Sequence, residues 1–255
     1  MTEIEAYDEG TPCWIDLTTP DLGKATEFYK ALFGWDYLDT GEAGGHYRLA
    51  TLRGKVVAGI GPMMRAGTPS TWTTYLSADD VDSAVARIDR AGGKVLLEPV
   101  DVMDKGRMAM VADPTDAVFG VWQPGKHRGA ELCNEPGTCR WNELLTDDPD
   151  TARAFYEQVF GYTYEEDPDF PGYLIFKVNG HRRGGIGPKP QDMPAGTPNF
   201  WDAYIAVADT DESTATARSN GATVQVSPTD MHYGRFSVVK DPGGASVSLI
   251  MEPES

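Results

Sequence analysis

The sequence contains no long apolar run, few cysteines and histidines, and a deficit of basic residues. No stretch of about 18 or more apolar residues is present, so we expect no membrane-spanning helix. The acidic first segment, residues 1–12, lacks the basic and apolar regions of a secretory signal peptide. These absences predict a cytoplasmic protein that does not associate with membranes.

The three cysteines, Cys13, Cys133 and Cys139, form no CxxC motif and no cluster with the four histidines. An odd number of cysteines in a chain of 255 residues favours free thiols over a disulfide framework. A lone cysteine more often packs as a small apolar residue than acts as a nucleophile. We therefore assign these thiols no catalytic role, with redox or nucleophilic chemistry as the alternative.

Acidic residues outnumber basic ones by 39 to 22, which gives a net charge of −17. Such a surface repels nucleic-acid phosphates and anionic lipids, so neither is an expected partner. Apolar residues make up 40% of the chain, which is enough for a packed core. The acidic surface itself needs no role beyond solubility.

The most informative feature is an internal repeat, which keeps its order and nearly its spacing along the chain. The matched segments are Gly10–Leu17 with Gly137–Leu144, Phe28-Tyr29 with Phe155-Tyr156, Phe33-Gly34-Trp35 with Phe160-Gly161-Tyr162, Gly59–Pro62 with Gly185–Pro188, and Asp113-Pro114 with Asp241-Pro242. The repeat predicts two domains, 8–124 and 136–253. The polar, Pro- and Gly-bracketed segment 125–135 between them is typical of a linker on the surface.

Each half shows a strand, a helix and several strands, twice over. In the first unit, Trp14–Thr18 predicts a strand, and a helix follows that begins at Thr19-Pro20 or at Asp21 and ends at Gly34. The helix after Asp209 has a poor apolar stripe, and we place it there only because the repeat requires it.

Four of these features together resemble the glyoxalase/bleomycin resistance/dioxygenase superfamily, also called the vicinal oxygen chelate proteins. They are the strand leading into an acidic residue, the Phe-Tyr pair of the first helix, the Phe-Gly-Trp that ends it, and the Asp-Pro turn before the last strand. The chain is similar to tandem actinobacterial members, some labelled hydroxylases or glyoxalase-like. The resemblance implies an α+β fold of four βαβββ units that form two eight-stranded, cup-like mixed sheets. It leaves open whether units pair within or between halves.

In metal-dependent members of this family, His, Gln or Glu side chains from four strands of a cup hold a divalent ion. The matching positions of the first half are Trp14, the strand end Ala58–Gly61, Thr73 and Gly120. Those of the second half are Trp141, Gly184–Gly187, Asp202 and Ser248. Only Asp202 carries a ligand group, whereas an ion needs three or four. We therefore expect neither a metal nor another cofactor.

The cup walls are predicted to be aromatic. Residues two apart on a strand face the same side, so Trp14 shares its wall with Asp16, and Trp141 shares its wall with Glu143. The same rule adds Thr73 with Tyr75, Asp202 with Tyr204, and Trp122 beside Gly120. Aromatic rings with a few polar groups suit a flat organic ligand, so we interpret these residues as ligand-binding. In the alternative interpretation, the tryptophans fill a closed core.

The acids Asp16 and Glu143 are the candidate catalytic residues. A carboxylate that faces an apolar cup must be paired, protonated or hydrated. If it is desolvated, its pKa is raised and it can act as a general acid or base. In the alternative, Arg107 and Arg235 pair with the acids, which we expect in at least one half. The arginines could instead hold an anionic or carbonyl ligand, or brace the turns that they follow.

The function that these residues favour is metal-independent binding of a small, aromatic organic molecule, for sequestration or resistance. A cofactor-independent tailoring enzyme of hydroxylase, isomerase or lyase type is the first alternative. A metal-dependent glyoxalase or dioxygenase is the second, and an interaction module with closed cups is a further one. The expected partner is a small molecule, and the chain is a monomer or a homodimer.

Overall fold

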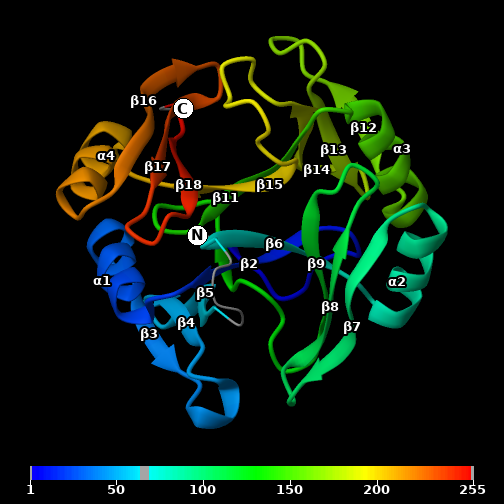
Figure 1. Ribbon diagram of the computed structural model, residues 1–255, viewed down its shortest axis with the longest axis horizontal. Helices are drawn as coiled ribbons and strands as arrows, with labels where there is room; N and C mark the ends of the chain where they lie inside the picture. Colours follow the sequence, from blue (N-terminus) through cyan, green and yellow to red (C-terminus); the bar gives the residue numbers. More distant parts are fainter. Residues whose placement is uncertain (1, 64–68, 254–255) are drawn as a thin grey trace.

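The computed structural model describes residues 2–63 and 69–253, and within them each half of the chain forms one eight-stranded mixed sheet (Figure 1). The N-terminal sheet has the order β3-β4-β5-β2-β6-β9-β8-β7. Its strands are β2 (Pro12–Thr19), β3 (Asp36–Asp39), β4 (Arg48–Leu52), β5 (Lys55–Pro62), β6 (Thr71–Ser77), β7 (Lys94–Val102), β8 (Gly106–Ala112) and β9 (Val118–Pro124).

The C-terminal sheet repeats this topology as β12-β13-β14-β11-β15-β18-β17-β16. Its strands are β11 (Cys139–Thr146), β12 (Thr163–Glu166), β13 (Leu174–Val178), β14 (His181–Pro188), β15 (Phe200–Ala206), β16 (Thr223–Met231), β17 (Gly234–Lys240) and β18 (Ser246–Met251). The α+β fold of four βαβββ units is confirmed, and the units of each sheet come from the same half.

Four helices and three short elements complete the described chain. The helices are α1 (Leu22–Phe33), α2 (Val81–Arg90), α3 (Pro149–Phe160) and α4 (Thr210–Ser219); the short elements are η1 (Glu42–Gly44) and the paired strands β1 (Thr2–Glu3) and β10 (Leu132–Cys133). No helix in the described ranges is long and apolar enough to span a bilayer.

Local signals set the helix ends. The Asp21 carboxylate accepts a hydrogen bond from the Lys24 amide and so caps α1, which ends at Gly34 with φ 71°. Helix α4 lies where the repeat predicts it, although its apolar stripe is weak. Its buried Thr214 hydroxyl lies 2.7 Å from the Ser237 hydroxyl on β17, so hydrogen bonding replaces part of the missing apolar contact.

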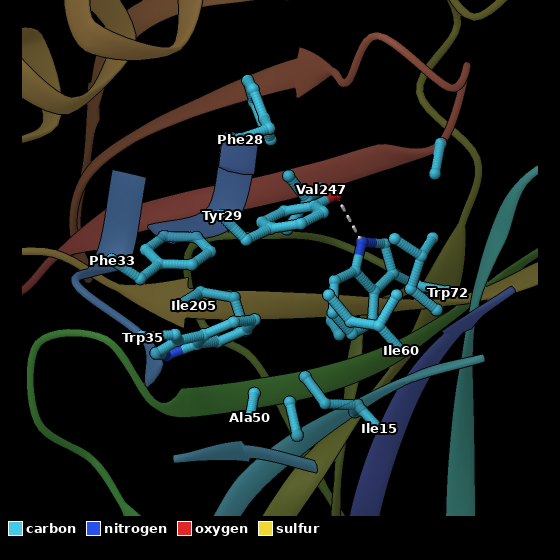
Figure 2. Packing of buried hydrophobic residues seen from close by; sticks show 14 of the residues in the cluster. Ile15, Phe28, Tyr29, Phe33, Trp35, Ala50, Ile60, Trp72, Ile205 and Val247 are labelled. Atoms are coloured by element: carbon cyan, nitrogen blue, oxygen red, sulfur yellow. Dashed lines mark hydrogen bonds between the residues drawn. The ribbon is translucent and has the colours of Figure 1, made fainter. Parts of the chain in front are cut away.

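The convex faces of the two sheets lie back to back, with β6 beside β15, and the concave faces open in opposite directions (Figure 1). Helix α1 packs beside α4 and α2 beside α3, so both cores contain residues from both halves. Figure 2 shows one of these cores, in which Tyr29 of α1 lies above Trp72 and near Val247 of the other half. The Tyr29 hydroxyl donates to the Asp241 carboxylate at 2.9 Å. The halves are therefore joined by a shared, hydrogen-bonded core.

The predicted surface position of the linker is wrong for its central part. Ala130 and Leu132 are buried, and the Ala130 amide donates to the Cys13 carbonyl at 2.8 Å. The His127 ring lies between the rings of Trp14 and Trp122, at centroid distances of 4.4 and 5.5 Å. The small and apolar residues of this segment and the ring of His127 allow it to pack along the N-terminal sheet, which its overall polarity did not reveal.

Candidate functional site

The concave faces carry the side chains that alternation predicted. On β2, Ile15 and Leu17 enter the core between the sheets, whereas Trp14 clusters with Tyr75 and Trp122 on the other face. We call this concave face the N-terminal cup. The matching concave face of the second sheet, the C-terminal cup, is built around Trp141, Glu143, Tyr173, Asp202 and Tyr204.

In the N-terminal cup, Asp16 is held by two tyrosines. Its Oδ2 atom accepts hydrogen bonds from the hydroxyls of Tyr47 at 3.0 Å and Tyr75 at 3.2 Å. The Trp14 indole N–H donates to the Tyr47 hydroxyl at 3.1 Å. Burial raises the pKa of Asp16 to about 6, against the lowering effect of the two tyrosine hydrogen bonds. This cup therefore holds one desolvated acid inside an aromatic wall.

The C-terminal cup repeats the arrangement around Glu143. The Tyr173 hydroxyl donates to Oε2 at 2.7 Å, and the Tyr204 hydroxyl donates to Oε1 at 2.9 Å. The Trp141 indole N–H donates to the Tyr173 hydroxyl at 2.9 Å. Burial raises the pKa of Glu143, and the two hydroxyl donors oppose that shift by stabilising the anion. Both oxygens of this acid are occupied by tyrosine.

The tyrosines Tyr47 and Tyr173 were not among the predicted site residues. Each ring lies over a glycine of the Gly-Ile-Gly-Pro strand, and a methyl group on Gly59 or Gly185 would overlap the tyrosine hydroxyl. These glycines stand directly beside the cup acid, since Gly59 pairs with Asp16 in the sheet register. The repeated glycines were therefore a usable signal, because they mark the place where a ring covers the backbone.

We expect Gly185→Ala to lower the free energy of unfolding by about 1–3 kcal/mol, because the Tyr173 ring must leave its position over β14. Urea unfolding measures the change. Gly23→Ala is the matched control, since it lies in helix α1 with its nearest neighbour atom 3.4 Å from the added methyl group. Alanine is the better helix former there, so this variant should be neutral or more stable. Equal effects of both substitutions would contradict this account of the glycine.

The arginines do not pair with the cup acids. Arg107 donates to Asp82 of α2 at 2.8 Å and to Asp101 of β7 at 2.9 Å. Its neighbours in alternation, Ala109 and Val111, belong to the core between the sheets. Arg107 therefore faces helix α2 on the convex side, away from the N-terminal cup.

Arg235 repeats this arrangement on β17, with Asp211 of α4 and Asp230 of β16 as its partners. The predicted ion pairs of these arginines with Asp16 and Glu143 are therefore wrong. Both arginines lie on the face of their strands that the helices cover. The sequence spacing alone did not determine this face. They brace the helices and edge strands, as the structural alternative expected.

The two cups differ at one pair of touching positions. Where the N-terminal cup has Thr73 and Gly120, the C-terminal cup has Asp202 and Ser248, and the Ser248 hydroxyl donates to Asp202 Oδ2 at 2.6 Å. Asp202 stands directly across from Glu143 in the sheet register. Burial raises the pKa of Asp202 to about 7, and the nearby Glu143 charge adds to the shift. Only this cup, among the described residues, has two carboxyl groups side by side.

The cups also differ in how their entrances are covered. In the N-terminal cup, His127 packs on Trp14 and Trp122, and both tryptophans are buried. In the C-terminal cup, Trp141 is partly exposed, whereas Asp202 does not differ from its N-terminal counterpart Thr73, since both are partly exposed. The C-terminal cup is thus the more accessible of the two.

Two segments meet beside the C-terminal cup. The Tyr233 hydroxyl, on the turn between β16 and β17, donates to the buried Asp167 carboxylate after β12. The Phe170 and Tyr233 rings are stacked at a centroid distance of 6.5 Å. The first and last units of this cup are therefore connected by polar and aromatic contacts, which the sequence did not indicate.

The residues at the four ligand positions of a metal-dependent cup do not fit a divalent ion. In the N-terminal cup these positions hold an indole, two glycines and a threonine, and the tyrosine rings cover the glycines. In the C-terminal cup Asp202 is the single acidic ligand, with Ser248 as its neighbour. Within residues 2–63 and 69–253, no three His, Cys, Asp or Glu side chains converge on a point where an ion could be held.

Tandem βαβββ cups with back-to-back sheets define a class of two-domain proteins. A family model described as "Glyoxalase/Bleomycin resistance protein/Dioxygenase superfamily" matches residues 13–121 and again 139–249. The chain therefore belongs to this superfamily, as its motifs predicted.

Two curated relatives align along almost the whole chain. "Putative glyoxylase CFP32" of Mycobacterium bovis is 44% identical over 98% of each chain. "Anthracycline biosynthesis protein DauV" of a Streptomyces species is 34% identical over 96% of this chain and 94% of its own.

Solved structures share the fold at low identity. The Mn(II)-bound glyoxalase from Novosphingobium aromaticivorans superposes with a TM-score of 0.67 at 19% identity, over 97% of this chain and 84% of its own. The 2,2',3-trihydroxybiphenyl 1,2-dioxygenase from Sphingomonas wittichii gives 0.65 at 12% identity, over 96% and 91%. At these identities the likeness establishes the architecture alone.

Proposed function

We propose that this protein binds a small, flat aromatic molecule in its C-terminal cup without a metal ion. The observation that carries the proposal is the replacement of metal-ligand positions by an indole and by glycines that tyrosine rings cover. A cup built in this way offers ring faces and a few fixed polar groups, which is the composition of sites for planar organic ligands.

The C-terminal cup is favoured because its indole, Trp141, is partly exposed, whereas Trp14 is buried. A ligand that stacks on the Trp141 indole would also reach the carboxyl groups of Glu143 and Asp202. The name of the Streptomyces relative, an anthracycline biosynthesis protein, supports a polycyclic aromatic ligand. We infer that the protein holds such a molecule unchanged, in a sequestering or protective role.

Titration of the metal-free protein with 2,6-dihydroxyanthraquinone, followed by calorimetry, tests the proposal. We expect saturable binding at one site, and recovery of unaltered ligand by mass spectrometry. Addition of Mn(II), Zn(II) or Fe(II) should leave the affinity unchanged. Binding only in the presence of one of these ions would overturn the metal-independent proposal.

Comparison of Trp141→Ala with Trp14→Ala shows which of the two cups binds the ligand. Loss of an indole face on which a ring stacks should weaken binding at least tenfold, about 1.4 kcal/mol or more. We expect this loss in Trp141→Ala, where the indole is partly exposed. If Trp14→Ala abolishes binding and Trp141→Ala does not, the ligand lies in the N-terminal cup and the assignment is wrong.

A cofactor-independent reaction is the second candidate function. The specific observation that favours it is the pair of neighbouring carboxyl groups, Glu143 and Asp202, on adjacent strands of one cup. A carboxyl group with a pKa of about 7, as for Asp202, suits proton transfer at neutral pH. Return of a chemically altered ligand from the titration above would favour this function over binding alone.

A further inference from the structure

The C-terminal cup contains a carboxyl pair whose two members have different surroundings. Glu143 and Asp202 are direct partners across the antiparallel strands β11 and β15, so their side chains point to the same face. Burial of Asp202, and to a lesser degree the nearby negative charge of Glu143, favour its neutral form, so the pair keeps one proton near neutral pH.

The hydrogen bonds decide which member keeps the proton. Glu143 accepts from two tyrosine hydroxyls, one on each oxygen, and both donors stabilise its charged form. Asp202 accepts from a single hydroxyl, that of Ser248. The negative charge therefore lies on Glu143, and Asp202 is the neutral acid.

The Ser248 contact also selects the oxygen that carries the proton. The Ser248 hydroxyl lies 2.6 Å from Oδ2; we assign the hydrogen of this contact to Ser248, which leaves Oδ2 as the acceptor and places the proton of the neutral acid on Oδ1. Asp202 Oδ1 has no side-chain partner in the described part of the chain, and the residue is partly exposed in the cup. A hydrogen-bond donor is thus available to a bound molecule.

The N-terminal cup is built in the same way but lacks this donor. It has the same indole, acid and two tyrosines, but Thr73 and Gly120 stand where the second cup has Asp202 and Ser248. The two positions that differ touch each other and together make one oriented acid. A structural role common to both cups would not require this change.

We propose that neutral Asp202 is the ligand-recognising acid of the C-terminal cup, and that it donates a hydrogen bond from Oδ1 to the carbonyl oxygen of an aromatic ketone or quinone. This inference rests on the proposed binding function and names the chemical class of the ligand. Ionised Asp202 can only accept, and it repels a carbonyl oxygen. Affinity for the carbonyl ligand should therefore be high while Asp202 is protonated and fall as the pH rises through about 7, the pKa of this group.

The other titratable groups around Asp202 are one carboxyl group and two tyrosines. They are Glu143 on β11, Tyr204 on β15 itself, and Tyr173 behind Glu143, while β18 contributes Ser248, which does not titrate. Burial holds the pKa of both tyrosines well above 10, so they stay neutral. A change in binding near pH 7 that depends on the carbonyl group thus reports the carboxyl pair.

The test compares two probes without titratable groups, 9-fluorenone and fluorene, which differ only in the carbonyl oxygen. Tryptophan fluorescence titrations between pH 5.5 and 8.5 give both affinities. For 9-fluorenone we expect about a tenfold loss of affinity across this range, the size of one hydrogen bond. Fluorene should show a flat profile.

Asp202→Asn keeps a hydrogen-bond donor at this position but removes the titrating carboxyl group. Its amide oxygen can accept from Ser248 while the amide N–H donates into the cup, so 9-fluorenone binding should stay tight and lose its pH dependence. Asp150→Asn, the same change at an exposed site on α3, should keep the wild-type profile. The double change Asp202→Thr with Ser248→Gly, which copies the N-terminal cup, should remove the preference for 9-fluorenone.

Equal affinity for the two probes at pH 6, or a wild-type pH profile in Asp202→Asn, would overturn the assignment of Asp202 while leaving aromatic binding intact. If neither these probes nor 2,6-dihydroxyanthraquinone binds, the proposed function fails together with it. Circular dichroism of each variant at both ends of the pH range shows whether the fold is retained.

Discussion

The N-terminal half, expressed as residues 1–135, is expected not to form a stable monomer. Its sheet is complete, but one face of α1 and one face of α2 pack against α4 and α3 of the other half (Figure 1). In one core, Phe28 and Trp72 of the N-terminal half belong to the same buried cluster as Ile205 and Val247 of the C-terminal half. Separation would expose both apolar faces, which together exceed what a soluble monomer leaves uncovered.

Gel filtration with light scattering and circular dichroism check this prediction. We expect the isolated half to aggregate, or to form a homodimer in which a second copy replaces the missing half. Coexpression with residues 136–255 should restore a one-to-one complex with the secondary structure of the intact chain. A folded monomer of residues 1–135 would show that the shared core is dispensable.

Replacement of Trp35 by alanine is expected to lower the free energy of unfolding by about 3–5 kcal/mol. This indole is fully buried at the end of α1, among Tyr29, Phe33 and Trp72. Its N–H donates to the carbonyl of Gly137 in the other half at 2.7 Å. The substitution leaves a large cavity and also an unpaired carbonyl at the junction of the halves.

Urea unfolding of two milder variants separates these causes. Trp35→Phe keeps much of the ring volume and loses the hydrogen bond, so it should cost less than alanine. Tyr162→Phe at the repeat-related position removes only the hydroxyl that donates to the Gly10 carbonyl, which should cost about 1 kcal/mol. A loss below about 1 kcal/mol for Trp35→Ala would contradict the role of this ring in joining the halves.

Much of the fold was readable from the sequence because its signals are local and occur twice. Asp21 and Gly34 set the ends of α1 by hydrogen bonding and backbone conformation, which depend only on near neighbours. Even α4, with its poor apolar stripe, could be placed because the repeat transfers the position from α2. The same repetition identified the cup acids Asp16 and Glu143 by their alternation with Trp14 and Trp141.

Several predictions about side-chain partners were wrong or incomplete. The arginines that seemed suited to the cup acids face the helices instead, because a one-residue change in strand phase moves a side chain to the opposite face. Tyr47 and Tyr173, whose hydroxyls donate to the acids, directly precede β4 and β13 and are about 30 residues away from those acids in the sequence. The position of His127 between two tryptophans depends on the path of a connecting segment that carries no periodic pattern.

The sequence by itself determined the four-unit architecture, the superfamily and the lack of metal ligands at the expected positions, since these follow from repeated residues at fixed spacing. The tertiary structure decided that units pair within each half while the cores are shared between halves. It also decided that tyrosines cover the strand glycines, and that Asp202 stands beside Glu143 with Ser248 orienting it. Such choices depend on contacts between residues distant in the chain, and no local pattern encodes which distant groups meet.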